Sequence, residues 1–173
     1  VLLGGGTFTF HSTSNVSVTH LPLQTDQERE MKNSVDPNAI VTRGAARSDV
    51  ERILSMVRAL AHHHGDVPGV SAKALERDIF GEIPWIYALV AEVDGRAVGY
   101  AALCPMIKLE VGERGIDMHH LFVEAEFRGS GIGRRLINAS MAKARELNCA
   151  SMTVSTHPDN ANAKAVYLAG GFE

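Results

Sequence analysis

Residues 120–147 read HLFVEAEFRGSGIGRRLINASMAKAREL, and this stretch decides the fold. Its apolar start, His120 to Val123, predicts a strand, and the apolar spacing from Ile132 to Leu147 predicts an amphipathic helix. Between them lies a glycine-rich turn, Arg128 to Gly133. Glycines let backbone N–H groups converge on an anion, and the helix N-terminus adds partial positive charge. The stretch therefore predicts a pyrophosphate-binding turn; a plain connection with solvated arginines remains the alternative.

The spacing of the glycines excludes two common phosphate sites. A P-loop needs a Lys followed by Ser or Thr after its second glycine, and none stands here. A dinucleotide fingerprint needs G-x-G-x-x-G, whereas residues 129–133 read G-x-G-x-G and are followed by Arg134 and Arg135. A different pyrophosphate ligand is therefore expected.

Two motifs resemble those of the GCN5-related N-acetyltransferases (GNAT). The first is Arg128-x-x-Gly131-x-Gly133, and the second is Asn160-x-x-Ala163-x-x-x-Tyr167, followed by Gly171-Phe172. The resemblance covers residues 43–173, and residues 80–93 are similar to the polyamine (spermidine/spermine-type) branch. It implies an α/β (α+β) fold: a mixed, mostly antiparallel central sheet with a splayed strand pair and flanking helices.

The chain divides into two predicted regions. Residues 1–38 are rich in Gly, Ser, Thr and Asn and predict a flexible or hairpin leader, and residues 39–173 predict the acetyltransferase domain. The family's final strand is missing after Glu173, so one hypothesis places the leader on the open sheet edge.

Strands and helices are expected to alternate along this domain. Ser48 to Glu51 reads as a capping box, Ser71 as a second helix cap, and Asp94-Gly95 as a hairpin turn. Asp159 or Asn160 is expected to cap the last helix. The expected strands are residues 40–43, 87–93, 97–103, 117–123 and 151–156.

Composition limits the partners. A net charge of −3 does not suggest a nucleic-acid binder, and no run of 18 apolar residues predicts a membrane span. Two cysteines predict no disulfide framework and fit a reducing cytoplasm. His62 to His64 are adjacent on a predicted helix, fan around it and cannot converge on one ion, so no metal is predicted. Because family members often dimerise, a homodimer is expected.

The resemblance implies acetyl-CoA as co-substrate. The strand backbone of Leu121, Phe122 and Val123 would pair with the pantetheine arm, and the Val123 N–H would donate to the thioester oxygen. Asn160 would bind the pantetheine or cap its helix, and Lys164 would reach the phosphates or lie in solvent. Either Arg134 or Arg135 would supply charge to the pyrophosphate. The turn residues implied to bind it are Arg128, Gly129, Ser130, Gly131, Ile132, Gly133 and Arg134.

Two side chains are the candidate catalysts. Tyr167 in the second motif is the candidate general acid, with helix packing as the alternative. His119 stands four residues before Val123, where similar families often carry a carboxylate, and is the candidate general base, with plain packing as the alternative. His120 is expected on the opposite face of the strand, and Glu92 is the reserve base.

The predicted function is an acetyl-CoA-dependent N-acetyltransferase. It would move an acetyl group to the primary amine of a small molecule, a polyamine, an amino acid or similar, by direct attack in a ternary complex. Two alternatives remain: a non-catalytic acyl-CoA-binding sensor, and a protein or peptide N-acetyltransferase.

Overall fold

A five-stranded sheet forms the centre of the computed structural model, which describes residues 35–156 and 160–172. The strands follow the order β1-β2-β3-β4-β5; the first three pairings are antiparallel and β4–β5 is parallel. The predicted mixed, mostly antiparallel sheet is confirmed. Residues 1–34, and with them most of the predicted leader, lie outside the described residues. The strands are β1 (Ile40–Gly44), β2 (Tyr87–Val93), β3 (Arg96–Lys108), β4 (Glu113–Val123) and β5 (Ser151–Val154).

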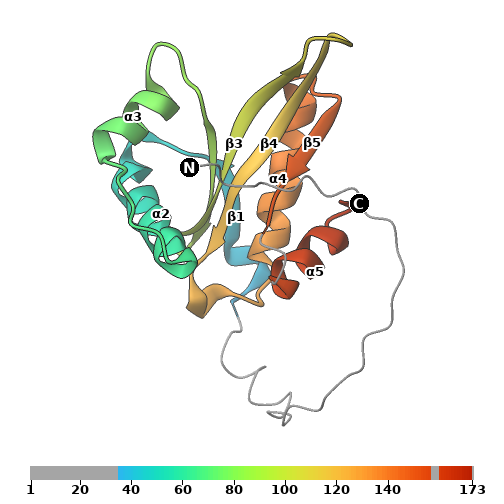
Figure 1. Ribbon diagram of the computed structural model, residues 1–173. Helices are drawn as coiled ribbons and strands as arrows, with labels where there is room; N and C mark the ends of the chain where they lie inside the picture. Colours follow the sequence, from blue (N-terminus) through green and yellow to red (C-terminus); the bar gives the residue numbers. More distant parts are fainter. Residues whose placement is uncertain (1–34, 157–159, 173) are drawn as a thin grey trace.

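Helices cover both faces of the sheet (Figure 1). One face carries α2 (Val50–His64) and α3 (Ala72–Phe80), and the other carries α4 (Ile132–Glu146) with α5 (Ala161–Ala169) beside it. No helix within the described ranges is both long and apolar enough to cross a membrane. Three short 3-10 turns precede β1, α2 and α4: η1 (Pro37–Ala39), η2 (Arg47–Asp49) and η3 (Ala125–Phe127).

Strand alternation divides the buried side chains into two cores, one on each face. Toward α2 and α3, Val90, Tyr100 and Phe122 of the sheet pack against a set of helical residues. Toward α4, Val98, Leu103 and Ile116 form the second core. Both faces are therefore apolar along the middle strands. The helical residues of the first core are Val50, Ile53, Leu54, Met56 and Leu75, and those of the second are Ile132, Leu136, Ile137 and Ala144.

The start of α2 differs from the predicted capping box. The carboxylate that reaches back belongs to Asp49, whose Oδ2 accepts the Ala46 N–H at 2.7 Å, and Ser48 is exposed. The prediction was wrong because η2 adds a turn before the helix and the capping box runs from Ala46 to Asp49, two residues earlier than predicted. The Ser71 cap is confirmed, since its side chain accepts the Ala74 N–H at 3.2 Å.

The β3–β4 hairpin is longer than predicted. β3 continues to Lys108 and β4 begins at Glu113, with Lys108 opposite Glu113. Most of the added residues are exposed and are held by pairing between the two strands alone. Because an exposed ladder leaves no alternation of burial, periodicity could not reveal it.

β4 and β5 pair over only a short part of β4. Their parallel pairing covers Gly115 to Met118 on β4 and Ser151 to Val154 on β5, after which β4 continues to Val123. The splayed strand pair implied by the sequence is confirmed. The splay leaves half of β4 without a neighbour on that side, and this half leads into the glycine-rich turn (Figure 1).

Candidate functional site

The free edge of β4 presents backbone groups to the gap beside β5. The Glu124 N–H donates to the Val98 carbonyl of β3 at 2.9 Å. Because successive N–H groups of an extended chain point to opposite edges, those of Val123 and Leu121 face the gap. An unpaired strand edge is a template for another extended chain. The site can therefore hold an extended amide-bearing ligand along Leu121–Val123.

The turn after β4 is built on left-handed glycines. Gly129 and Gly131 both have φ of +84°, and Gly131 is the N-cap of α4. The first helical hydrogen bond runs from the Arg135 N–H to the Gly131 carbonyl at 3.1 Å. The N–H groups of residues 132–134 therefore stand at the helix end, where an anion is stabilised. A Cβ added at Gly129, Gly131 or Gly133 would meet no heavy atom within 4 Å, so the turn faces open space.

Three arginines lie in or beside this turn, and each makes different contacts. The Arg128 Nε donates to the Val123 carbonyl at 2.9 Å, and its guanidinium lies over the Phe122 ring. Arg135 donates to the carbonyls of Pro37 and Ile40, so it holds the start of β1. Arg134 is exposed in the first turn of α4. Of the two arginines left open by the sequence, Arg134 is the one available to a ligand.

A β-bulge at His119 changes the faces of the two histidines. Ala102 of β3 lies opposite His120 and Leu103 opposite Met118, so His119 is an extra residue in β4. The two imidazoles stack with ring centroids 4.6 Å apart and planes 15° from parallel. The expectation that His120 points to the opposite face was wrong, because a bulge breaks the alternation of side chains.

His120 contacts a buried tyrosine. Its Nδ1 lies 2.8 Å from the Tyr100 hydroxyl oxygen, and Tyr100 is fully buried against the α2 face. Burial raises the pKa of Tyr100 because the tyrosinate would be desolvated. The hydroxyl therefore keeps its proton and can donate it to His120 Nδ1.

Asp117 is the residue of this site that the sequence interpretation missed. Its Oδ2 lies 3.8 Å from His119 Nδ1, and its Oδ1 accepts the Thr153 hydroxyl at 2.8 Å. Thr153 is its partner across the β4–β5 ladder, one pair before the strands part. Its position two residues before the candidate base, on the same strand, was the available signal.

Tyr167 lies on α5, half-buried, with its ring 5.9 Å from the ring of Phe172. Burial raises the pKa of Tyr167, and the negative charge of Asp117 raises it further. The side chain therefore stays protonated well into the alkaline range. The predicted acid and base thus share one carboxylate as a neighbour.

The remaining predicted residues are accounted for by local contacts. The Asn160 side chain accepts the Ala163 N–H at 3.0 Å, so it caps α5, one of the two roles left open. Lys164 lies in the first turn of α5, and Ser130 donates to the Phe127 carbonyl at 2.5 Å. Glu92, the reserve base, is ion-paired with Arg43 at 2.7 Å on the β1–β2 pair.

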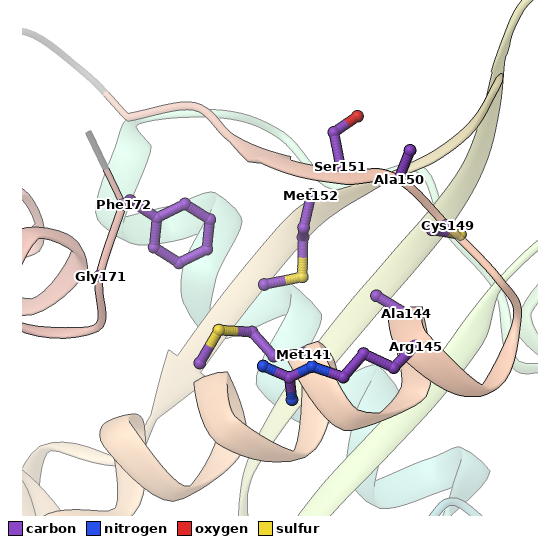
Figure 2. Close-up of a pocket in the computed structure, with 9 residues that line it drawn as sticks. All are labelled: Met141, Ala144, Arg145, Cys149, Ala150, Ser151, Met152, Gly171 and Phe172. Carbon is purple, nitrogen blue, oxygen red and sulfur yellow. The ribbon is translucent and has the colours of Figure 1, made fainter.

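Two hollows flank these elements. One, of about 420 Å³, lies between α2 and the end of β4 and includes Phe122 and Arg128 of the predicted site. Its other lining residues are Ala59, His62, Glu124, Ala125 and Glu126. The second, of about 250 Å³, lies between α4 and β5; Met141, Met152 and Phe172 point toward one another there (Figure 2). No predicted site residue lines the second hollow.

Comparisons with known proteins agree with this geometry. The family model "Acetyltransferase (GNAT) family" matches residues 56–172, which is more than half of the chain. The thialysine N-epsilon-acetyltransferase of Bos taurus is 30% identical over 142 residues, covering 76% of this chain and 83% of the relative.

Solved structures share the fold. A probable acetyltransferase superposes with a TM-score of 0.68 at 25% identity, covering 78% of this chain and 89% of the other. An aminoglycoside acetyltransferase from an uncultured soil metagenomic sample gives a TM-score of 0.68 at 16% identity, covering 78% and 88%, which shows a common fold. The splayed strands and the glycine-rich turn agree with the matched family model. The chain therefore belongs to the acetyltransferase (GNAT) family.

Proposed function

We propose that this GNAT enzyme transfers an acetyl group from acetyl-CoA to the primary amine of a small molecule, by direct attack in a ternary complex. The observation that supports this most is the free β4 edge from His119 to Val123, which leads directly into the Gly129–Gly133 turn. One continuous path thus offers strand-edge amides followed by a helix N-terminus.

The backbone and side-chain groups along this path are of the kinds that can bind the amides and the phosphates of acetyl-CoA. Leu121 and Val123 would pair with the pantetheine amides, and the N–H groups of residues 129–134, with the charge of Arg134, would hold the pyrophosphate. Phe122 and Arg128 would fix the strand end, since Arg128 already bridges to Val123. Acetyl-CoA supplies an acetyl group activated as a thioester.

His119 and Tyr167 would move the protons. His119 takes the proton from the acceptor ammonium, and the neutral nitrogen attacks the thioester carbonyl, whose oxygen accepts the Val123 N–H. The C–S bond breaks, its electron pair stays on sulfur, and Tyr167 protonates the sulfur. The proton lost by the acylated nitrogen returns Tyr167 to its neutral form, and His119 releases its own to solvent.

A small amine is the proposed acceptor. The Bos taurus relative is by its name a thialysine acetyltransferase, and this agrees with the polyamine-type resemblance of residues 80–93. Thialysine, lysine and short polyamines are therefore the first acceptors to test.

The test is thiol release from acetyl-CoA with these amines, aminoglycosides and short peptides, in the wild type and in Tyr167→Phe. We expect turnover with a small amine and a fall in kcat of roughly 100-fold in Tyr167→Phe, because the departing sulfur loses its acid. Acetyl-CoA affinity, measured by calorimetry, should stay within about twofold, because the hydroxyl is not needed for pairing along β4.

Leu168→Ala is the matched control, since Leu168 neighbours Tyr167 on α5 and is exposed. It should leave kcat unchanged. Equal kcat in Tyr167→Phe and the wild type would remove the acid role. Tight acetyl-CoA binding without turnover on any amine or peptide would contradict the proposed reaction and favour a sensor.

A further inference from the structure

Three ionisable side chains, those of Asp117, His119 and His120, gather on β4 where it parts from β5. In the described part of the chain, no group of three His, Cys, Asp or Glu side chains has the geometry to hold a metal ion. A carboxylate beside two imidazoles is a group of side chains that can bind and release protons.

Asp117 is anchored before the strands diverge. Thr153 Oγ1 of β5 donates to Asp117 Oδ1 at 2.8 Å, which leaves Oδ2 on the side of His119. The Asp117 side chain is 23% exposed, whereas that of His119 is 63% exposed. The Asp117 carboxylate, held by Thr153, therefore has a fixed position beside the more exposed His119 ring.

The partners of the two stacked imidazoles differ. His119 Nδ1 faces the Asp117 carboxylate at 3.8 Å, whereas His120 Nδ1 faces the Tyr100 hydroxyl at 2.8 Å. A carboxylate at Nδ1 favours the tautomer with the proton on Nδ1 and leaves the Nε2 lone pair basic. A hydroxyl that donates to Nδ1 favours the opposite tautomer, with the proton on Nε2.

The two stacked rings therefore offer different groups to a ligand, because His119 keeps a lone pair on Nε2 whereas His120 keeps its proton there.

We propose that Asp117 is a positioning residue that selects His119 over His120 as the base, by orienting its ring through Nδ1 and presenting Nε2 to the acceptor amine. The inference rests on the proposed function, because it assumes that an amine proton must be removed. It adds the group that directs the base, and it gives His120 the role of accepting the Tyr100 hydroxyl through Nδ1.

The first experiment is a double-mutant cycle with Asp117→Asn and His119→Ala, measured as kcat and KM for the acceptor found active in the panel. Asn keeps the size and can still accept the Thr153 hydroxyl, so the change removes mainly the charge. In the wild-type background we expect kcat to fall about tenfold, part of the roughly 10²–10⁴-fold worth of a general base. KM for acetyl-CoA should stay unchanged.

In the His119→Ala background, Asp117→Asn should produce no further loss, because its effect passes through the missing ring. Losses that multiply would overturn the proposal and leave Asp117 a structural residue. If His119→Ala keeps wild-type kcat, the base assignment of the proposed function fails instead. If His119→Ala is impaired while Asp117→Asn is not, only the inference fails.

The second measurement is independent of turnover. Long-range ¹⁵N–¹H correlation spectra of the ¹⁵N-histidine-labelled protein report which nitrogen of His119 holds its proton. We expect the Nδ1–H tautomer in the wild type and a shift toward Nε2–H in Asp117→Asn. Glu113→Gln, at the exposed start of β4, is the control and should change neither spectrum nor kcat. An Nε2–H tautomer in the wild type would overturn the proposal.

Discussion

At the residue scale, the site depends on what each polar side chain already contacts. From the sequence, His119 and Glu92 are candidate bases and Arg135 is a candidate pyrophosphate ligand. Their contacts in the structure distinguish which of them are available for these roles. Glu92 is ion-paired to Arg43, and Arg135 holds carbonyls of residues 37 and 40. His119 remains exposed at the divergence of β4 and β5.

Arg134 and Arg135 provide a matched pair of substitutions. We expect Arg134→Gln to weaken acetyl-CoA binding about three- to tenfold, because a charge at the helix N-terminus is removed from the pyrophosphate. Arg135→Gln should leave the affinity unchanged and lower the free energy of unfolding, since its two carbonyl contacts are lost.

Calorimetric titration with CoA at low and high salt measures the first effect, and urea unfolding measures the second. The Arg134 contribution should shrink at high salt because the charge is exposed. Weaker CoA binding in Arg135→Gln but not in Arg134→Gln would reverse the two assignments.

At the element scale, β4 determines the site because it is irregular in two places. The bulge at His119 brings two histidines to one face, and the loss of β5 after Met118 exposes the backbone edge. The bulge depends on the register of β4 against β3, which pairs with it from Gly99 to Lys108. The close packing at Gly99 can be tested directly.

Gly99 lies opposite Val123, and a Cβ at this position would lie 2.9 Å from the Phe122 carbonyl oxygen. We expect Gly99→Ala to reduce the free energy of unfolding by about 1–3 kcal/mol, because β4 and α4 must move away from β3 to make room for the methyl group. Acetyl-CoA binding should weaken as well, since the backbone of Phe122 and Val123 shifts.

Gly44→Ala is the control, because a Cβ there would meet no heavy atom within 4 Å. Urea unfolding followed by circular dichroism gives the stability, and calorimetry gives the affinity. A Gly99→Ala protein with unchanged stability and unchanged affinity would show that the β3–β4 spacing tolerates a methyl group.

At the scale of the whole molecule, β1, β2 and α2 are joined by a partly buried ionic cluster. Arg43 of β1 donates to Asp49 at the start of α2 at 2.6 Å and to Glu92 of β2 at 2.7 Å. The hydrogen bond from Arg43 keeps the pKa of Asp49 below its ordinary value, and the Ala46 N–H adds to this. The cluster makes folding stability depend on pH.

A carboxylate whose pKa is lowered by folding stabilises the protein above its ordinary pKa, and this stability is lost as pH falls through the lowered value. Between pH 7 and about pH 4 the Asp49 contribution should be constant, and below about pH 4 it should decline. Asp49→Asn should lower stability by about 1–3 kcal/mol at pH 7 and flatten the decline below pH 4.

Urea unfolding from pH 3 to 7 measures this dependence. Glu76→Gln breaks the exposed Arg47–Glu76 pair and should cost less than about 1 kcal/mol. An Asp49→Asn protein that loses stability toward acid as steeply as the wild type would place the acid sensitivity elsewhere.

The sequence by itself determined the two-faced sheet, the strand–turn–helix order and the family. These follow from short-range patterns, because apolar alternation sets which face of a strand is buried and glycines set the local backbone. Confirmed in this way are the Ser71 cap and the Asp94-Gly95 turn, whose φ angles are +50° and +79°. The splayed strand pair, which the family resemblance implied, is confirmed as well.

Only the tertiary structure decided which of the candidate residues come together. The bulge at His119 depends on the register of β4 against β3, and the Asp117–Thr153 contact joins strands far apart in the chain. Periodicity assumes regular pairing, so it placed His119 and His120 on opposite faces. Register and cross-strand partners are set by the packing of the whole sheet, and this packing is what distinguishes the two histidines.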